Sequence, residues 1–223
     1  MIKIHEDFQQ GTPEWLSARK GVLTASNIKQ LVTPKTKKIA NNEDVRLYAY
    51  QMIAERNTDF LEDNFMSYNM EQGHLNEVYA RDHYSEHYAE VKEVAFITND
   101  KYGFKMGYSP DGLVGDDGLI EIKSRLSKFQ VKHIIDGVTP DEFKIQCQTG
   151  LLVSEREWID FISYSGGLPM FVIRSFPDFE LQEKIIEACT LFENTVSELS
   201  KKYNENKKKY YMTEKRETEE ITL

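Results

Sequence analysis

Cysteine is scarce in this chain, which has two, Cys147 and Cys189, among 223 residues. Two thiols cannot build a disulfide framework, a four-thiolate zinc site or a four-cysteine iron–sulfur site. The sequence also has no apolar run near the roughly 18 residues that a membrane-spanning helix needs. Its N-terminus lacks the basic and apolar regions of a secretory signal. We therefore expect a protein of the reducing cytoplasm.

Positive charge is also in short supply. The 28 Lys and Arg residues face 37 Asp and Glu residues, which gives a formal net charge of −9. An acidic protein is repelled at long range by nucleic acids and by anionic membranes. The charge balance therefore disfavours non-specific binding to DNA along the outer surface, although a local basic channel remains compatible with it.

Linkers rich in Pro, Gly or Ser and internal repeats are lacking before about residue 200. Hydrophobic residues make up 40% of the chain and aromatic residues 12%, so the chain can bury a core. We expect a single domain over residues 1–205. Residues 206–223 are read as a polar C-terminal tail, because they offer no apolar face.

Hydrophobic periodicity and turn residues predict the order of the elements. Helices are expected at 12–21, 27–32, 44–56, 70–88, after 139 and at 178–203, and strands at 94–97, 104–108, 118–123, 158–164 and 170–174. We expect the first three strands to form a meander. The alternation of helices and strands predicts an α/β fold.

One stretch of the sequence contains candidate catalytic and metal-binding residues. Asp111 lies in a Ser-Pro-Asp-Gly turn, and a strand with Glu121 and Lys123 on one face follows it. A hairpin can bring Asp111 beside that face. Two carboxylates and the main-chain carbonyl of Ile122 would then form a hard oxygen site suited to Mg²⁺ or Mn²⁺. Such a site fits metal-assisted hydrolysis of a phosphodiester.

The same residues also allow ordinary structural interpretations. Ser-Pro-Asp-Gly is a common turn, and Glu-Ile-Lys is a common amphipathic strand. Glu77 adds a carboxylate if its helix packs on the sheet, or it is a surface residue paired with Arg81 at i+4. Gln146 and Gln148 either contact a ligand or face solvent. The residues alone leave these alternatives open.

Several short blocks in a fixed order carry a family resemblance. They are Glu14-Trp15-Leu16, Arg19, Gly21-Val22, Thr24-Ala25-Ser26, Gly73 with Glu77, Ser109-Pro110-Asp111-Gly112, Glu121-Ile122-Lys123, Gln146-x-Gln148 and Trp158-x-Asp160-Phe161. Together they resemble the phage lambda exonuclease (YqaJ-like viral recombinase) family of the PD-(D/E)xK nuclease superfamily, over about residues 10–175. The resemblance implies a restriction-endonuclease-like core, with a mixed central β-sheet flanked by α-helices.

The resemblance also implies roles for individual residues. The implied metal ligands are Asp111, Glu121, Glu77 and the carbonyl of Ile122, and the implied catalytic set is Asp111, Glu121, Lys123, Glu77 and Gln146. Arg19, Ser26 and Ser109 match positions that handle the terminal 5′ phosphate of DNA, which suits the donors that these side chains carry. The chain departs from the family around Gln146, where relatives often carry a tyrosine and this chain has Phe143 before it and Thr149-Gly150 after it.

The activity implied by the resemblance is Mg²⁺-dependent degradation of double-stranded DNA from its ends, 5′→3′, with Mn²⁺ as a substitute ion. It would leave 3′ single-stranded overhangs for phage-type recombination, in the bacterial host cytoplasm if the protein is phage-encoded. Members act as rings, usually trimers, and cooperate with a single-strand annealing protein, so the resemblance implies a homotrimer and such a partner for this chain. The rival interpretations are a junction-resolving or restriction-type endonuclease, and a catalytically silent DNA-end-binding module. Basic residues that flank the site in sequence are Arg19, Lys35, Lys37, Lys38, Arg125 and Lys128.

Overall fold

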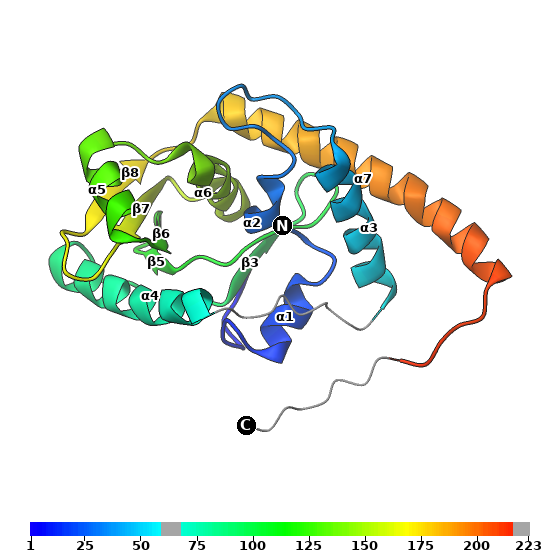
Figure 1. Cartoon of the computed structure of the whole chain (residues 1–223), viewed down its shortest axis with the longest axis horizontal. Coiled ribbons are helices and arrows are strands. Elements are labelled where there is room, and N and C mark those ends of the chain that lie inside the picture. The colour runs from blue at the N-terminus through cyan, green and yellow to red at the C-terminus, as the bar shows by residue number, and fades with distance from the viewer. Residues whose placement is uncertain (59–67, 216–223) are drawn as a thin grey trace.

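The computed structural model describes residues 1–58 and 68–215, without the side chains of residues 68–72 and 74. The elements follow the order β1 (Ile2–His5), α1 (Pro13–Arg19), β2 (Leu23–Thr24), α2 (Ala25–Ile28), α3 (Glu43–Asn57), α4 (Tyr68–His87), β3 (Phe96–Asn99), β4 (Met106–Tyr108), β5 (Gly112–Val114), β6 (Gly118–Ser124), α5 (Ser127–Asp136), α6 (Asp141–Ser154), β7 (Trp158–Tyr164), β8 (Phe171–Ser175), α7 (Phe179–Asn206) and a short 3₁₀ turn, Lys207–Lys209 (Figure 1). Residues 216–223 of the expected tail lie outside the described part.

The strands form two four-stranded mixed sheets, with orders β1-β3-β4-β2 and β5-β6-β7-β8. The mixed α/β fold is therefore confirmed, with two sheets where we expected one central sheet. The predicted meander is wrong, because β4 pairs with β3 and β2 whereas β6 pairs with β5 and β7. Pro110 lies between β4 and β5 and has no N–H to give to a ladder, so the chain passes there from the first sheet to the second.

The second sheet carries Glu121 and Lys123, two of the residues predicted to form the site. β5 and β6 form an antiparallel hairpin in which Gly112 is opposite Ile120. β7 runs parallel to β6 and places Phe161 beside Glu121 and Ser163 beside Lys123. A parallel pair needs a crossover connection, and α5 and α6 provide it. α5 and the edge strands β1, β2 and β5 were not predicted from the sequence.

Helices cover both faces of the second sheet. In Figure 1, α4 runs below β5 and β6, and α6 lies above them. The lower face buries a small apolar cluster that includes Tyr84 of α4 with Ile120 and Ile122 of β6. The larger core cluster lies on the other side, among α2, α3, α6 and α7. Because side chains alternate along a strand, Glu121 and Lys123 point toward α6.

The first helix follows its sequence signals. The Thr12 side chain accepts a hydrogen bond from the Trp15 amide at 3.3 Å, Pro13 occupies the first turn, and Gly21 follows the helix with a φ of +66°. α2 is shorter than predicted and ends at Ile28. Within the described residues, none of the helices is both long enough and apolar enough to cross a membrane.

Candidate active site

The hairpin brings Asp111 onto β6. Asp111 lies one residue before the Gly112–Ile120 pair, and its Oδ2 accepts a hydrogen bond of 2.5 Å from the Ile122 amide. The Asp111 carbonyl accepts a hydrogen bond of 2.9 Å from Arg81 Nε on α4. The turn is therefore fixed to β6 on one side and to α4 on the other. This confirms the predicted hairpin geometry.

Glu121 is the most enclosed of these carboxylates, with 1% of its surface exposed. Its Oε2 accepts a hydrogen bond of 2.7 Å from the Tyr108 hydroxyl. Its Oε1 contacts Gln146 Nε2 of α6 at 2.5 Å and Lys123 Nζ at 2.5 Å. The strand face predicted from the alternation thus meets α6, which brings Gln146 into contact with Glu121.

The electrostatic environment of the site favours positive charge. Partial burial and the neighbouring Glu121 raise the pKa of Asp111 well above its usual range, against the opposing effect of Lys123. Burial works to lower the pKa of Lys123, but Glu121 and Asp111 outweigh it and raise that pKa. Lys123 therefore stays charged and stabilises both carboxylates. Oxygen donors of this kind also fit a hard divalent cation.

Glu77 lies on α4, which packs on β6, and its charge acts on both Asp111 and Lys123. Glu77 therefore lies near Asp111 and Lys123, and its role as a metal ligand stays a prediction. Arg81 contacts the Asp111 carbonyl and pairs with Glu93 at 2.8 Å. We call Asp111, Glu121 and Glu77 the carboxylate cluster.

Gln148, the other glutamine of the predicted motif, faces away from the carboxylate cluster. Its Oε1 accepts a hydrogen bond of 2.8 Å from the Asp178 amide, and its Nε2 donates to the Phe176 carbonyl at 2.9 Å. It joins α6 to the start of α7. The sequence left open whether Gln148 contacts a ligand or faces solvent. It does neither, because its side chain is buried and joins two structural elements.

Tyr108 was missed as a site residue, because the sequence shows it only as a strand aromatic. It is fully buried, and burial with the nearby carboxylates raises the pKa of its phenol well above 10, so the hydroxyl stays a donor. A Cβ at Gly150 would lie 2.8 Å from the Tyr108 ring. Glycine within a helix costs about 1 kcal/mol relative to alanine. That mid-helix glycine is the sequence signal of a close approach.

A second group adjoins the carboxylates. Arg19 Nη1 donates to Ser109 Oγ at 2.8 Å, and its Nη2 lies 3.5 Å from Ser26 Oγ. Trp15 Nε1 also donates to Ser109 Oγ, at 2.9 Å, and the Arg19 guanidinium lies 4.3 Å from the centroid of the Trp15 ring. We call Arg19, Ser26, Ser109 and Trp15 the arginine cluster. It unites the three residues predicted to handle a phosphate.

Charge in the arginine cluster suits an anion. Burial lowers the pKa of Arg19 to about 10, which still leaves the guanidinium charged at neutral pH. Ser26 Oγ lies 3.2 Å from Thr24 Oγ1 at the start of α2. An arginine fork and hydroxyl groups on one side of a site are suited to phosphate oxygens.

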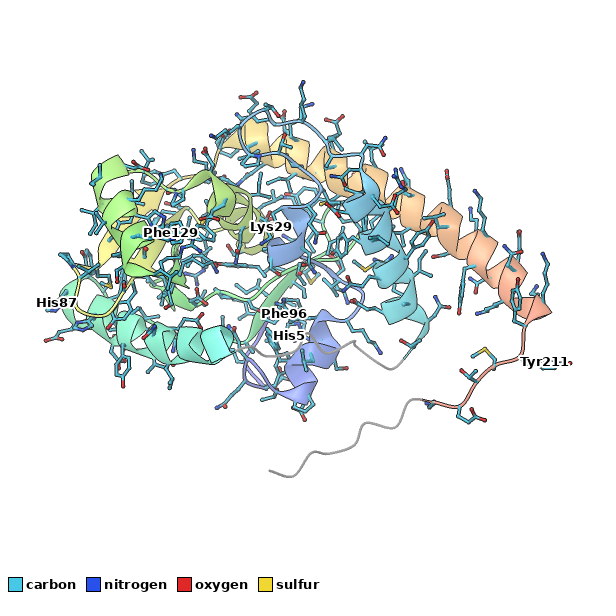
Figure 2. The ribbon with its side chains drawn as sticks, viewed as in Figure 1. His5, Lys29, His87, Phe96, Phe129 and Tyr211 are labelled. Atoms are coloured by element: carbon cyan, nitrogen blue, oxygen red, sulfur yellow. The ribbon has the colours of Figure 1, made fainter. Side chains whose placement is uncertain are left out.

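The other basic residues are placed differently from one another. Lys35 pairs with Asp141 at 3.4 Å, and Lys37 pairs with Glu180 at 2.7 Å, so the loop before α3 is tied to the starts of α6 and α7. Arg125 stays near the carboxylate cluster. The Arg125 guanidinium lies 5.3 Å from the centroid of the Phe143 ring, and Lys123 Nζ lies 5.7 Å from the same ring. The guanidinium also lies 4.8 Å from the ring of Phe129 on α5, which Figure 2 labels.

Comparisons with known proteins identify solved structures that are similar to this chain. LHK-Exo, an alkaline exonuclease from Laribacter hongkongensis, is 30% identical with a TM-score of 0.72, and the match covers 87% of this chain and 99% of that chain. LHK-Exo in complex with dAMP matches at 31% identity with the same TM-score and coverage. A phage-related exonuclease from Haemophilus somnus, at 14% identity, a TM-score of 0.52 and 80% and 96% coverage, shares the fold.

A comparison with curated proteins found no match. The sequence profile of the YqaJ-like viral recombinase domain matches residues 14–157 of the 223. These residues contain α1 from its second residue onward, the hairpin that carries Asp111 and Glu121, and α6 with Gln146. The chain belongs to the YqaJ-like viral recombinase family.

Proposed function

We propose that this protein is a metal-dependent exonuclease that degrades double-stranded DNA from its ends. The observation that carries this proposal is the adjacency of the two clusters. Ser109 binds Arg19, and two residues later Asp111 binds the β6 backbone beside Glu121. An anion held by the arginine cluster would therefore lie next to carboxylates that fit a cation. Phosphodiester hydrolysis at a DNA end needs both.

The proposed metal ligands are Asp111, Glu121, Glu77 and the Ile122 carbonyl, and the proposed ion is Mg²⁺, with Mn²⁺ as a substitute. A bound divalent ion lowers the pKa of water and offsets charge on the phosphate. Lys123 would hold a proton at Nζ beside the attacking water and stabilise negative charge. Gln146 would orient Glu121 from α6, as it does through its 2.5 Å contact.

The direction of degradation is proposed from the arginine cluster. Arg19, Ser26 and Ser109 would bind a terminal 5′ phosphate, which places the adjoining phosphodiester near the carboxylate cluster. Digestion would then proceed 5′→3′ and leave 3′ single-stranded overhangs for recombination. We also propose a homotrimeric ring and a single-strand annealing partner, on the family resemblance alone. Residues 1–205 are proposed as the nuclease domain.

Two structures of one relative support this proposal. LHK-Exo is an alkaline exonuclease, and one structure of it contains dAMP. A mononucleotide in a relative of 31% identity fits a protein that acts on DNA. The rival is an endonuclease of the same superfamily, and a silent DNA-end-binding module is a further alternative.

The test uses linear duplex DNA labelled at one end, with a 5′ phosphate or a 5′ hydroxyl, in the presence and absence of Mg²⁺. We expect release of mononucleotides from the 5′ end that requires the metal and is faster with the phosphate. A covalently closed circular duplex should stay intact. Cleavage of the circle would favour an endonuclease, and no metal-dependent release from any substrate would favour the silent module.

A further inference from the structure

We propose that Tyr108 is a positioning residue that fixes the orientation of the Glu121 carboxylate and thereby favours Mg²⁺ and Mn²⁺ over Ca²⁺. The proposal rests on the proposed function, because it takes Glu121 as a metal ligand. Tyr108 would act through Glu121 and would contact neither the metal nor the DNA. Its role follows from three features of the structure.

The first feature is the division of donors between the two Glu121 oxygens. Oε1 contacts both Gln146 Nε2 and Lys123 Nζ at 2.5 Å, whereas the Tyr108 hydroxyl is the donor to Oε2 among the described residues. A carboxylate oxygen has two acceptor positions. Oε2 therefore keeps one position for a cation, and the Tyr108 hydrogen bond at 2.7 Å sets where that position points.

The second feature is the way in which the Tyr108 ring is held. Tyr108 is 1% exposed at the end of β4, and its ring fills the space beside Gly150 of α6. A Cβ there would lie 2.8 Å from Cε1 and 2.9 Å from Cζ of the ring. Glycine is a poor residue for the middle of a helix. The glycine therefore allows α6 to come close enough to lock the phenol in one position.

The third feature is that α6 carries both Gly150 and Gln146. One helix thus fixes Glu121 twice, directly through Gln146 and indirectly through the ring of Tyr108. Donors that surround a metal ligand commonly determine its orientation, and their removal typically weakens metal binding by about 10- to 100-fold. Tyr108 and Gln146 hold opposite oxygens of the same carboxylate, so they restrict its rotation together.

A fixed carboxylate does not serve all cations equally. Mg²⁺ demands near-ideal octahedral geometry with short bonds, whereas Ca²⁺ accepts six to eight oxygens in flexible geometry. A Glu121 side chain that is free to rotate would therefore cost Mg²⁺ or Mn²⁺ more than it costs Ca²⁺. The Tyr108 hydrogen bond should appear as ion selectivity, which simple packing of an aromatic ring would not produce.

The experiment compares Tyr108→Phe with Tyr84→Phe in the full-length protein without DNA. Tyr84 is a matched control, because its buried hydroxyl donates to Asp160 Oδ2 at 2.6 Å, and its ring belongs to the apolar cluster on the opposite face of the second sheet. Mn²⁺ binding is followed by electron paramagnetic resonance of the free ion, and Ca²⁺ binding by calorimetry. We expect Tyr108→Phe to weaken Mn²⁺ binding by about tenfold and Ca²⁺ binding by about threefold or less. Tyr84→Phe should leave both unchanged.

A second variant guards against loss of folding in the first. Gly150→Ala keeps the Tyr108 hydroxyl but pushes the ring, so it should lower the Mn²⁺ to Ca²⁺ affinity ratio in the same direction. An unchanged ratio in both variants, or an equal fall in Tyr84→Phe, would overturn the role of Tyr108. If the wild type then still digests DNA with Mg²⁺, the proposed function stands without a role for Tyr108. A wild type that binds neither ion would overturn both proposals.

Discussion

Arg19 Nη1 donates a hydrogen bond of 2.8 Å to Ser109 Oγ across 90 positions of the sequence. This bond joins the end of α1 to the turn that carries Asp111. Asp111 in turn accepts from the Ile122 amide on β6. A short chain of contacts therefore links the arginine cluster to the carboxylate cluster, so that an anion at one would have a defined position relative to the other.

The first prediction concerns selection of DNA ends. Arg19→Ala should slow digestion of 5′-phosphorylated duplex by about 100-fold, since charge-assisted hydrogen bonds are worth about 1.5–3 kcal/mol each. Digestion of 5′-hydroxyl duplex should change little. The measurement is the initial rate of nucleotide release from the two substrates.

Arg46→Ala is a suitable control for Arg19→Ala, because Arg46 is exposed on α3 and pairs with Glu43 at 2.6 Å. It should keep the preference for phosphorylated ends. An equal loss on both kinds of end in Arg19→Ala would contradict a role in phosphate recognition.

The second prediction concerns the carboxylate cluster. Asp111→Asn removes a negative charge with little change in shape, and Lys123→Ala removes the cation that contacts Glu121. Each should lower metal-dependent digestion by at least about 100-fold, because positioned charges account for several kcal/mol of catalysis. Circular dichroism should show a folded protein in both cases.

Lys132→Ala serves as the control for Lys123→Ala. Lys132 is exposed on α5, where it pairs with Asp136. Its loss should leave digestion near the wild-type rate. Full activity of either site variant would remove that residue from the catalytic assignment.

The third prediction concerns stability on the opposite face of the second sheet. Arg174 binds buried Asp160 through two contacts of 2.8 and 2.9 Å, and Tyr84 donates to the same carboxylate. Arg174→Met would leave the Asp160 charge without its cation and should lower the free energy of unfolding by about 1–2 kcal/mol, because the half-exposed Arg174 is partly screened by water. Urea denaturation measures this change.

Addition of Asp160→Asn to Arg174→Met should restore part of the lost stability, because it removes the buried charge. Mn²⁺ affinity should stay unchanged in both variants. A marked change in metal binding would show that the two faces of the sheet are coupled.

The fourth prediction concerns acid stability. His133 is 3% exposed, and its Nδ1 lies 2.9 Å from Ser163 Oγ, which itself donates to Gln130. Burial, with Arg125 nearby, lowers the pKa of His133 below 6.5. The unfolded chain then takes up a proton below pH 6.5 that the folded protein resists.

Stability should accordingly be unaffected by His133 above pH 6.5 and should fall as pH drops below it, by up to about 1.4 kcal/mol per pH unit until the folded pKa is reached. His133→Gln should flatten this dependence. Urea midpoints between pH 8 and pH 5 measure the slope, and an unchanged slope in the variant would contradict the assignment.

Sequence periodicity predicted the elements that follow local rules. Thr12, Pro13 and Gly21 bounded α1 correctly, and the alternation of Glu121 with Ile122 correctly placed the acidic side chain on one face of β6. Edge strand β1 has only four residues, and α5 buries the polar Gln130 and His133 while Val131, Ile134 and Ile135 are exposed, so both elements were missed. The division into two sheets could not be predicted, because strand pairing joins residues far apart in the chain.

The sequence by itself determined which residue types could do chemistry and in which order they occur, and this order was enough to indicate the family. The tertiary structure decided which of them meet. It brought Gln146 into contact with Glu121 and Gln148 into contact with the start of α7, although both glutamines lie on one helix. It also brought Tyr108 to Glu121. Periodicity fixes the face on which a side chain lies, but packing of distant elements determines its partner.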